Sequence, residues 1–278
     1  MVPFLTHNRS LQILKLSNNG LGPSGGTIVA EALLASAKAS TAEGKESKLR
    51  VVHCGRNRLE NGSAPKFAEA FAAHGKLIDV RMPQNGIRQE GITALAEALV
   101  SCSTMEYLDL QDNCTSNDSA EEGWQALAKA ISAWPHLHTL ELSDSVLNNE
   151  GAAMLFDILA QGRHTKLTKL HLQNDNLDET ILETISGVLE HLPALKTLEL
   201  QWNEVDPDDP RVQVLQATFK RRGGVLRVED EDEEEEDEEE REEKEEVIEE
   251  KAAAEPEEQG IDDLADAMSK LGIDKKQP

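Results

Sequence analysis

One pattern of apolar residues returns seven times along the chain. Its first copy is Leu11-x-x-Leu14-x-Leu16-x-x-Asn19-x-Leu21. The same frame begins again at Leu49, Leu77, Met105, Leu137, Leu167 and Leu195. Successive starts are 38, 28, 28, 32, 30 and 28 residues apart. A period of this kind means that each unit packs mainly on its neighbours, so the chain should fold as a stacked array.

Each unit is expected to hold one strand and one helix. The Leu-x-Leu centre alternates with period 2, which predicts a short strand whose leucines point inward. Helical spacing follows, for example in Trp124, Leu127, Ala128 and Ile131. Units near 28 residues leave room for a full helix. The sequence therefore predicts an α/β leucine-rich-repeat solenoid, a ribonuclease-inhibitor-like horseshoe with parallel strands inside and helices outside.

The asparagine of the pattern is expected to have a structural role. Its side chain can bond the backbone where the chain leaves a strand, and a row of such residues would form a ladder through the array. Ser145 and Asp175 stand at this position in the fifth and sixth repeats. Because they can bond the backbone less fully, these two repeats are expected to be the looser ones.

The repeat domain is predicted to span residues 1–228. Residues 1–10 look like the end of a helix that runs into the first strand, so the array is expected to begin part-way through a repeat. The insert Ala35–Lys48 predicts a lengthened helix followed by a loop. Gly223–Val228 look like a last strand.

A strongly acidic region follows the repeats. Residues 229–250 contain 18 acidic residues against Arg241 and Lys244, in a chain whose net charge is −25. Like charges repel and little there can be buried, so 229–260 is predicted to be disordered. A short amphipathic helix is expected within 261–278, from the spacing of Ile261, Leu264, Met268 and Leu271. The acidic segment either keeps the chain soluble or attracts a basic partner.

Composition excludes several classes of function. The body has no basic stripe and aromatic residues make up only 3% of the chain, which argues against nucleic-acid binding. No apolar run is long enough for a membrane span. The three cysteines are too few for a disulfide framework or a zinc site, and Cys54 falls at an inward strand position. No metal or cofactor is expected.

A catalytic constellation is also missing. The histidines are spread over different repeats and are predicted to be surface residues: His53, His136, His138, His164 and His171. Neither Gly25-Gly26 nor Gly223-Gly224 is followed by the Lys-Ser/Thr of a phosphate-binding loop. The chain is therefore not expected to be an enzyme in its own right.

The exposed strand positions form a strip that changes in charge along the array. The residues between the inward leucines are Lys15, His53, Arg81, Asp109, Glu141, His171 and Glu199. This strip is either ordinary solvated surface or a bipolar surface that matches a partner of complementary polarity. Polar residues that the repeat pattern does not require also follow the strands, namely Asn18, Arg56, Arg58, Gln84, Gln111 and Asp112. Rigid loops of this kind suit protein recognition.

Several of these loops carry a family resemblance. The motifs are Asn18-Asn19-Gly20-Leu21-Gly22-Pro23, Cys54-Gly55-Arg56-Asn57-Arg58-Leu59-Glu60-Asn61-Gly62-Ser63, Gln84-Asn85-Gly86-Ile87-Arg88-x-Glu90-Gly91 and Leu108-Asp109-Leu110-Gln111-Asp112-Asn113. They resemble those of the Ran GTPase-activating proteins, especially the fungal form, over nearly the whole chain. The acidic run and the ending Leu264-Ala265-Asp266-x-x-Ser269-Lys270 are similar too.

The resemblance implies an activator of the small GTPase Ran. Members of the family bind Ran in its GTP form and hold Ran's own glutamine so that it orients the attacking water. By motif the assisting asparagine is Asn18 or Asn19, and we favour Asn18 because Asn19 serves the repeat. The resemblance implies no cofactor and no catalytic residue of the chain's own. The residues expected to bind the partner are Lys15, Arg56, Arg58, Arg81, Gln84, Gln111 and Asp112.

The resemblance also implies a setting. Ran-binding protein and transport receptors are expected in the same complex. The chain is expected in the cytoplasm and at the nuclear envelope, with some nuclear shuttling. The family has further repeats and an important arginine before the loop that matches Asn18. These have no counterpart here, which leads us to expect an N-terminally truncated form.

Two other functions compete with this one. Acidic leucine-rich-repeat proteins that chaperone histones or other basic proteins also join such repeats to an acidic tail. They use shorter repeats, and the Gly55-Arg56-Asn57-Arg58 loop argues against them. Inhibitors of ribonucleases share the fold but are much richer in cysteine than this chain.

Overall fold

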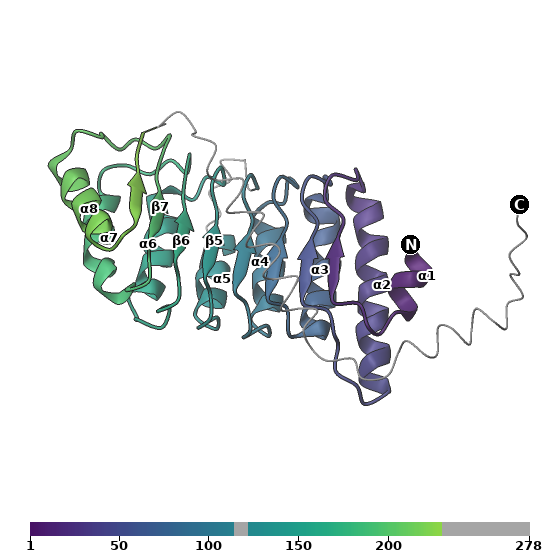
Figure 1. Cartoon of the computed structure of the whole chain (residues 1–278). Helices are drawn as coiled ribbons and strands as arrows, with labels where there is room; N and C mark the ends of the chain where they lie inside the picture. The colour runs from purple at the N-terminus through teal and green to yellow at the C-terminus, as the bar shows by residue number, and fades with distance from the viewer. Residues whose placement is uncertain (114–121, 230–278) are drawn as a thin grey trace, which may run out of the picture. The chain divides into compact units, whose positions relative to one another are not determined.

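The repeats form one parallel sheet of eight strands with helices on one side of it. The computed structural model describes residues 1–113 and 122–229. The strands follow one another in chain order: β1 (Ile13–Lys15), β2 (Val51–His53), β3 (Asp79–Arg81), β4 (Tyr107–Asp109), β5 (Thr139–Glu141), β6 (Lys169–His171), β7 (Thr197–Glu199) and β8 (Val225–Arg227). Each pairs in parallel with the next (Figure 1). The predicted leucine-rich-repeat solenoid is confirmed.

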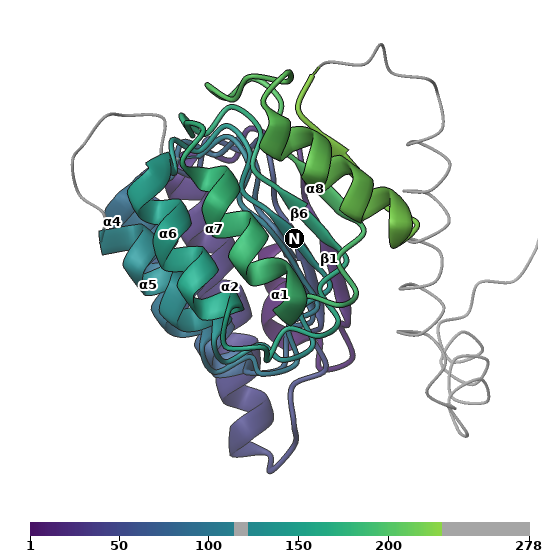
Figure 2. The ribbon, with the colours of Figure 1, turned by 90° about the vertical axis from the view of Figure 1, so that its left-hand side faces the viewer.

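One helix follows nearly every strand. After the short α1 (Val2–His7), the helices are α2 (Gly22–Ala42), α3 (Glu60–His74), α4 (Gln89–Leu99), α5 (Glu122–Ile131), α6 (Asn148–Leu159), α7 (Ile181–Val188, with a 3-10 turn Leu189–His191) and α8 (Pro210–Arg221). Seen along the array, α2–α7 stand on one side of the sheet (Figure 2). The helix α2 is the longest, because the insert at Ala35 extends it to Ala42.

Equivalent positions of the repeat pattern pair with one another in the sheet, so the pattern determines the register of the strands. The middle residues of the strands, from Leu14 and Val52 to Leu198 and Leu226, are paired with one another and buried. Helix residues such as Phe67, Phe71 and Trp134 close the core from the other side. At about 25 cal/mol for each Å² of apolar surface removed from water, this core is the main source of the array's stability.

The ladder of asparagines runs along the end of each strand. The side-chain oxygen of Asn57 accepts the backbone N–H of Asn19 (3.0 Å), and its amide donates to the carbonyls of Leu16 (2.8 Å) and Cys54 (3.1 Å). Asn85, Asn113 and Asn203 bond in the same way. Each ladder residue thus ties one repeat to the previous one, which holds the loops after the strands in fixed positions.

A short helix precedes the first strand, and an eighth strand follows the seventh repeat. Residues 2–7 form α1, with Leu5 buried, and β8 extends the sheet where a last strand was predicted. Apart from Glu229, the predicted acidic segment 229–260 and the predicted helix in 261–278 lie outside the described residues. Within the described ranges, no helix combines the length and the apolar character that a membrane span needs.

Candidate functional site: the rim of the repeat array

The residue just before each ladder residue lies in the left-handed backbone region. Its φ is between +51° and +60° in all seven repeats. We call this set the rim row, and its members are Asn18, Arg56, Gln84, Asp112, Asp144, Asn174 and Trp202. Non-glycine residues adopt such angles rarely and at a cost of roughly 1 kcal/mol or more. The array accepts that cost once in every repeat.

The backbone of the rim row continues the hydrogen bonding of the sheet. The N–H of Asn18 donates to the carbonyl of Gly55 (2.9 Å), and the N–H of Arg56 donates to that of Pro83 (2.9 Å). The bonds from Gln84 to Gln111 and from Asp112 to Ser143 repeat the geometry. Because the backbone is fixed from repeat to repeat, the rim row presents one side chain per repeat along a common edge.

Asn18 and Asn19 differ in what their amides do. Asn19 donates its side-chain amide to the carbonyls of Leu16 (2.9 Å) and Ser17 (3.1 Å), within its own loop. The side chain of Asn18 is exposed and makes no hydrogen bond to any described residue. An asparagine amide can donate and accept at once, so Asn18 offers both functions to a partner.

Arg56, Arg58 and Gln84 lie beside Asn18 on the same edge. The Nε of Arg56 donates to the side-chain oxygen of Gln84 over 2.6 Å, which links two neighbouring repeats. Arg58 is exposed and also left-handed (φ +53°), at a position that glycine fills in the first and third repeats, as Gly20 and Gly86. Val146 and Asn176 take the same left-handed position in the fifth and sixth repeats, so Arg58 is the residue that places a charge there.

The prediction named two adjacent residues in the fourth repeat, Gln111 and Asp112. Asp112 occupies the rim row, while Gln111 lies one residue earlier, and its side-chain amide donates to Asp144 (3.3 Å). Asp144 also accepts from the amide of Asn174 (2.8 Å). Burial, and then the charge of Asp144, raise the pKa of Asp112 above its usual range. The middle of the rim is therefore acidic and linked by hydrogen bonds.

The strip of charges on the strands is largely paired within itself. Asp79 lies 3.1 Å from Nε2 of His53 and accepts two hydrogen bonds from Arg81 (2.9 and 3.0 Å). The Arg81 guanidinium also lies 4.0 Å from the centre of the Tyr107 ring. Burial alone would raise the pKa of Asp79, but His53 and Arg81 hold it below its usual value. Arg81 is thus committed to its neighbours on the strands, away from the rim row.

A second set of paired charges covers the later strands. Nδ1 of His171 lies 2.5 Å from Glu141 and 3.2 Å from Glu199, and Arg227 lies 2.6 Å from the other oxygen of Glu199. Burial opposes the proton on His171, but the bond to Glu141 and the two carboxylate charges outweigh it and raise the pKa of His171. The surface made by the strands is in this way mostly neutralised.

The prediction that the histidines lie on the surface is wrong for three of them. His164 is completely buried and bonds the carbonyl of Ile131 through Nε2 (2.9 Å). His53 and His171 are buried in the ion-pair strip, because neighbouring carboxylates offset the cost of removing them from water. Cys54 is buried as expected, and burial raises the pKa of its thiol to about 12.

Asp109 and Lys15 are the two remaining charged positions of the strip. Asp109 has its pKa raised to about 7, first by burial and then by the charge of Glu141. Lys15 is exposed at the end of the strip, on β1 beside His53 in the register. Of the predicted partner-binding residues, the structure therefore places Arg56, Arg58, Gln84, Gln111 and Asp112 on or beside the rim, and Lys15 and Arg81 on the strands.

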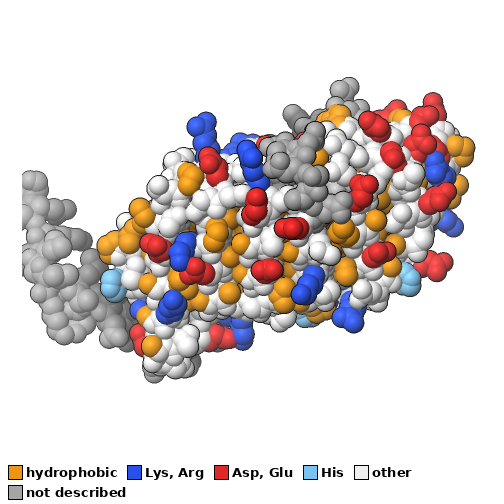
Figure 3. Space-filling model, turned by 180° about the vertical axis from the view of Figure 1, so that it is seen from behind, with side chains coloured by type: hydrophobic (Ala, Val, Ile, Leu, Met, Phe, Trp, Pro, Cys, Tyr) orange, Lys and Arg blue, Asp and Glu red, His pale blue; other side chains and the backbone are white. Residues whose placement is uncertain are grey.

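The rim changes sign along the array. Its first repeats carry Arg56 and Arg58, and its later repeats carry Asp112 and Asp144. In Figure 3, acidic side chains gather toward the upper right, the end that holds the last repeats, and basic side chains stand along the upper left. Such a gradient favours one orientation of a charged partner.

Sequence reasoning missed the left-handed backbone and three members of the rim row, Asp144, Asn174 and Trp202. The signal was available, because all three residues directly precede a ladder position. Their roles were hidden because no single loop shows that its backbone angle is shared by every repeat.

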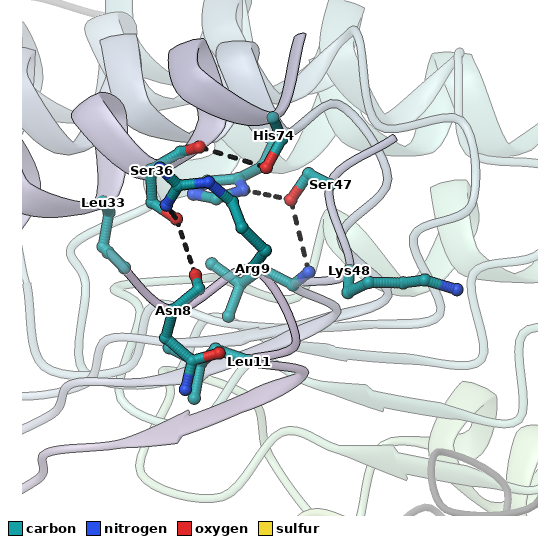
Figure 4. Close-up of a pocket in the computed structure, with 10 residues that line it drawn as sticks. Asn8, Arg9, Leu11, Leu33, Ser36, Ser47, Lys48 and His74 are labelled. Carbon is teal, nitrogen blue, oxygen red and sulfur yellow. Dashed lines mark hydrogen bonds between the residues drawn. The ribbon is translucent and has the colours of Figure 1, made fainter. Parts of the chain in front are cut away.

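A small cavity lies away from the rim, beneath α2, and is lined by Asn8, Arg9, Ser36, Ser47 and His74 (Figure 4). Its volume of about 10 Å³ suits one water molecule, far below what a substrate needs. No cluster of His, Cys, Asp and Glu within residues 1–113 and 122–229 could hold a metal ion.

Comparisons with known proteins agree with this architecture. The family described as Leucine Rich repeat matches residues 7–27 and 135–156. The Ran GTPase-activating protein 1 of Saccharomyces cerevisiae is 34% identical over 221 residues, which are 78% of this chain and 53% of the yeast protein. The chain thus spans about half the length of that relative.

Animal proteins with similar names match a shorter segment more strongly. The Ran GTPase-activating protein 1 of Xenopus laevis is 53% identical over 28% of this chain and 13% of its own length. Ran GTPase-activating protein 2 of Caenorhabditis elegans is 48% identical over 30% of this chain and 8% of its own length. The chain is a leucine-rich-repeat protein and a sequence relative of the Ran GTPase-activating proteins.

Proposed function

We propose that this chain binds Ran in its GTP form through the rim row and stimulates GTP hydrolysis by Ran. The observation that carries the proposal is the exposed amide of Asn18 on a backbone fixed by the sheet. The names of its relatives supply the partner. In this account the bond-breaking is done by the GTPase, and the chain acts as its regulator.

In this proposal, the rim assists hydrolysis by positioning the glutamine side chain of the GTPase. A small GTPase already carries the glutamine that orients the attacking water, but in solution that side chain moves. Asn18 would hold the glutamine amide through one donated and one accepted hydrogen bond. Fixing one group in this way reduces the entropy lost on reaching the transition state, which is worth orders of magnitude in rate.

The neighbouring residues would dock the partner and set its direction. Arg56, Arg58 and Gln84 would contact the GTPase beside Asn18, and Asp112 and Gln111 would contact it further along the rim. Lys15 and Arg81 would contribute charge from the strands. The proposed function also implies that the chain acts in the cytoplasm and at the nuclear envelope. There it would join complexes that can include Ran-binding protein and transport receptors.

A binding and hydrolysis comparison tests the proposal. The immobilised chain would be offered Ran-GTP, Ran-GDP and histones H3–H4, and single-turnover GTP hydrolysis by Ran would be followed with and without the chain. We expect preferential binding of Ran-GTP and faster hydrolysis. Tight histone binding without any preference for Ran-GTP would instead support the basic-protein chaperone.

A further inference from the structure

The last member of the rim row is an exposed tryptophan. Trp202 is 58% exposed, whereas the other two tryptophans, Trp124 and Trp134, are buried in the core. Every other member of the rim row is polar or charged. An indole in water leaves a large apolar surface unburied, so this position costs free energy that folding does not recover.

The backbone at Trp202 adds a second cost. Its φ of +60° is unfavourable for a bulky side chain, and the equivalent positions of the first and sixth repeats hold Asn18 and Asn174, which suit the angle better. The strand end beneath it is fixed, because the carbonyl of Gln201 accepts the N–H of Asn174 (2.9 Å). The fold therefore holds the indole exposed on a rigid backbone, although the indole does not contribute to the stability of the fold.

Three carboxylates that form no ion pair with any described residue follow Trp202 closely in the sequence. Glu204, Asp206 and Asp208 follow Trp202 and are all exposed. Arg211, the next cation after these carboxylates in the chain, already binds Asp209 (2.6 Å), and Arg227 on β8 binds Glu199 (2.6 Å). None of the ion pairs formed among the described residues includes Glu204, Asp206 or Asp208.

This combination of groups has a matching ligand. A cation that lies on an indole face is attracted by the ring, and nearby carboxylates strengthen that preference. Tryptophan on a fixed backbone is also a frequent centre of binding energy in protein interfaces. We propose that Trp202, with Glu204, Asp206 and Asp208, is a docking site for an arginine- or lysine-bearing segment of a partner protein.

The site is separate from the proposed GTPase contact. Neighbouring strands lie about 4.8 Å apart, so Trp202 is on the order of 30 Å from Asn18 along the rim. A partner bound at one end therefore leaves the other end accessible. The inference does not depend on the proposed function, because it follows from groups in the last repeat alone.

A peptide titration of the full chain tests the site. The probe is an octapeptide of alternating arginine and serine, and the control peptide has glutamine in place of arginine. The indole N–H signals of the ¹⁵N-labelled chain report each tryptophan separately, and Trp202→Asn assigns its signal by removing it. Asn suits the left-handed backbone, so this variant should fold.

We expect the basic peptide, and not the control peptide, to shift the Trp202 signal while Trp124 and Trp134 stay unchanged. Trp202→Asn should weaken peptide binding about two- to fivefold, and Trp202→Phe should weaken it less. The matched control is Val214→Asn, which removes an equally exposed apolar side chain from α8 and should bind as the wild type does.

Three results would overturn the inference. The first is an unchanged Trp202 signal while the peptide binds, which would assign binding to the acidic residues 229–250. The second is equal affinity of the wild type and Trp202→Asn. The third is the absence of any binding.

Discussion

At the scale of single residues, Asp175 shows most clearly how one substitution in a repeat changes its chemistry. It stands where other repeats have the ladder asparagine, and its Oδ1 accepts the N–H groups of Ser145 (2.9 Å) and Leu147 (3.3 Å). At the equivalent position Asn203 also donates, to Leu172 (2.7 Å) and Leu200 (3.0 Å). The Oδ2 of Asp175 is buried without a partner.

A carboxyl group can take over the donor role only when it carries a proton. Burial, with smaller contributions from Asp144 and Glu141, raises the pKa of Asp175 to about 8, although the two N–H groups act in the opposite direction. In the unfolded chain the same group titrates near 4. Between these values the folded state binds more protons, so this contribution to stability is lost as the pH rises from about 4 to about 8.

Asp175→Asn should therefore stabilise the array at pH 8. An asparagine supplies the missing donors, and satisfying a buried polar group is worth about 1–3 kcal/mol. The expected result is a higher Tm for the variant at pH 8, with a difference from wild type that shrinks toward pH 4. Thermal unfolding by circular dichroism across this range measures it.

The matched control is the reverse substitution at the ladder position of the next repeat. Asn203→Asp should lower the Tm, most strongly at high pH, because it removes donors at an equivalent position. An Asp175→Asn variant with wild-type stability at every pH would show that the donor role of the ladder is unimportant in the sixth repeat. The expectation that repeats five and six are looser remains a prediction.

At the scale of elements, glycine sets how closely the helices approach. A Cβ atom on Gly91 in α4 would lie 2.5 Å from Ile87, 2.7 Å from the side-chain oxygen of Asn61 and 3.1 Å from Ala64. Gly26 in α2 and Gly123 in α5 are crowded in the same way by the next or previous helix. The packing of α2, α4 and α5 against their neighbouring helices thus requires a missing side chain near the start of each of these three helices.

Gly91→Ala should destabilise the array by about 1–3 kcal/mol, because overpacking forces neighbouring helices apart. Gly187→Ala is the matched control: it is also in a helix, α7, but a Cβ there would meet nothing within 4 Å. It should be neutral or stabilising by up to about 1 kcal/mol, from helix propensity alone. Equal Tm values for the two variants would contradict this account of helix packing.

The sequence predicted the elements well where a period was present. The strands β1–β7 and the helix α5 follow from the leucine frame and from the helical spacing of Trp124, Leu127 and Ile131. The crowded glycines could not be predicted, because their role depends on contacts between residues of different repeats. The burial of His53, His164 and His171 was missed for the same reason, since their partners are one repeat away.

The candidate site was predicted in part. Asn18, Arg56 and Gln84 were selected as loop residues that the repeat pattern does not require. In the structure they share one backbone geometry. Gln111 and Asp112 were both selected, because a loop sequence does not show which of two adjacent residues adopts the left-handed angle; in the structure it is Asp112. The partner of the site came from a resemblance, and no spacing argument could have supplied it.

At the scale of the whole molecule, charge is distributed very unevenly. The chain carries 53 acidic and 28 basic residues, and 18 of the acids stand within 229–250. The last described strand, β8, ends at Arg227, just before this acidic run. Stability of a repeat array comes from contacts between neighbouring repeats, to which charges beyond the last strand add little.

Deleting residues 229–278 should leave the unfolding transition of the repeats cooperative and at nearly the same temperature. The removed charge should mainly affect the rate at which a basic partner associates, and the difference should shrink as salt is raised. Calorimetry and stopped-flow binding at two salt concentrations measure the two effects. A deletion that abolishes cooperative unfolding would contradict the domain boundary at 228.

The central claim is that the rim holds Asn18 in place to position a group of the partner GTPase. The most direct test is single-turnover GTP hydrolysis by Ran at saturating chain, measured together with the Kd for Ran-GTP, in Asn18→Gly and Asn174→Gly. Both variants keep a residue that accepts the left-handed backbone, so they differ in which amide is removed. We predict that Asn18→Gly slows the stimulated hydrolysis roughly tenfold to a hundredfold with little change in Kd, while Asn174→Gly leaves the hydrolysis rate unchanged. An Asn18→Gly variant that binds more weakly but hydrolyses GTP at the full rate when saturated would contradict the claim.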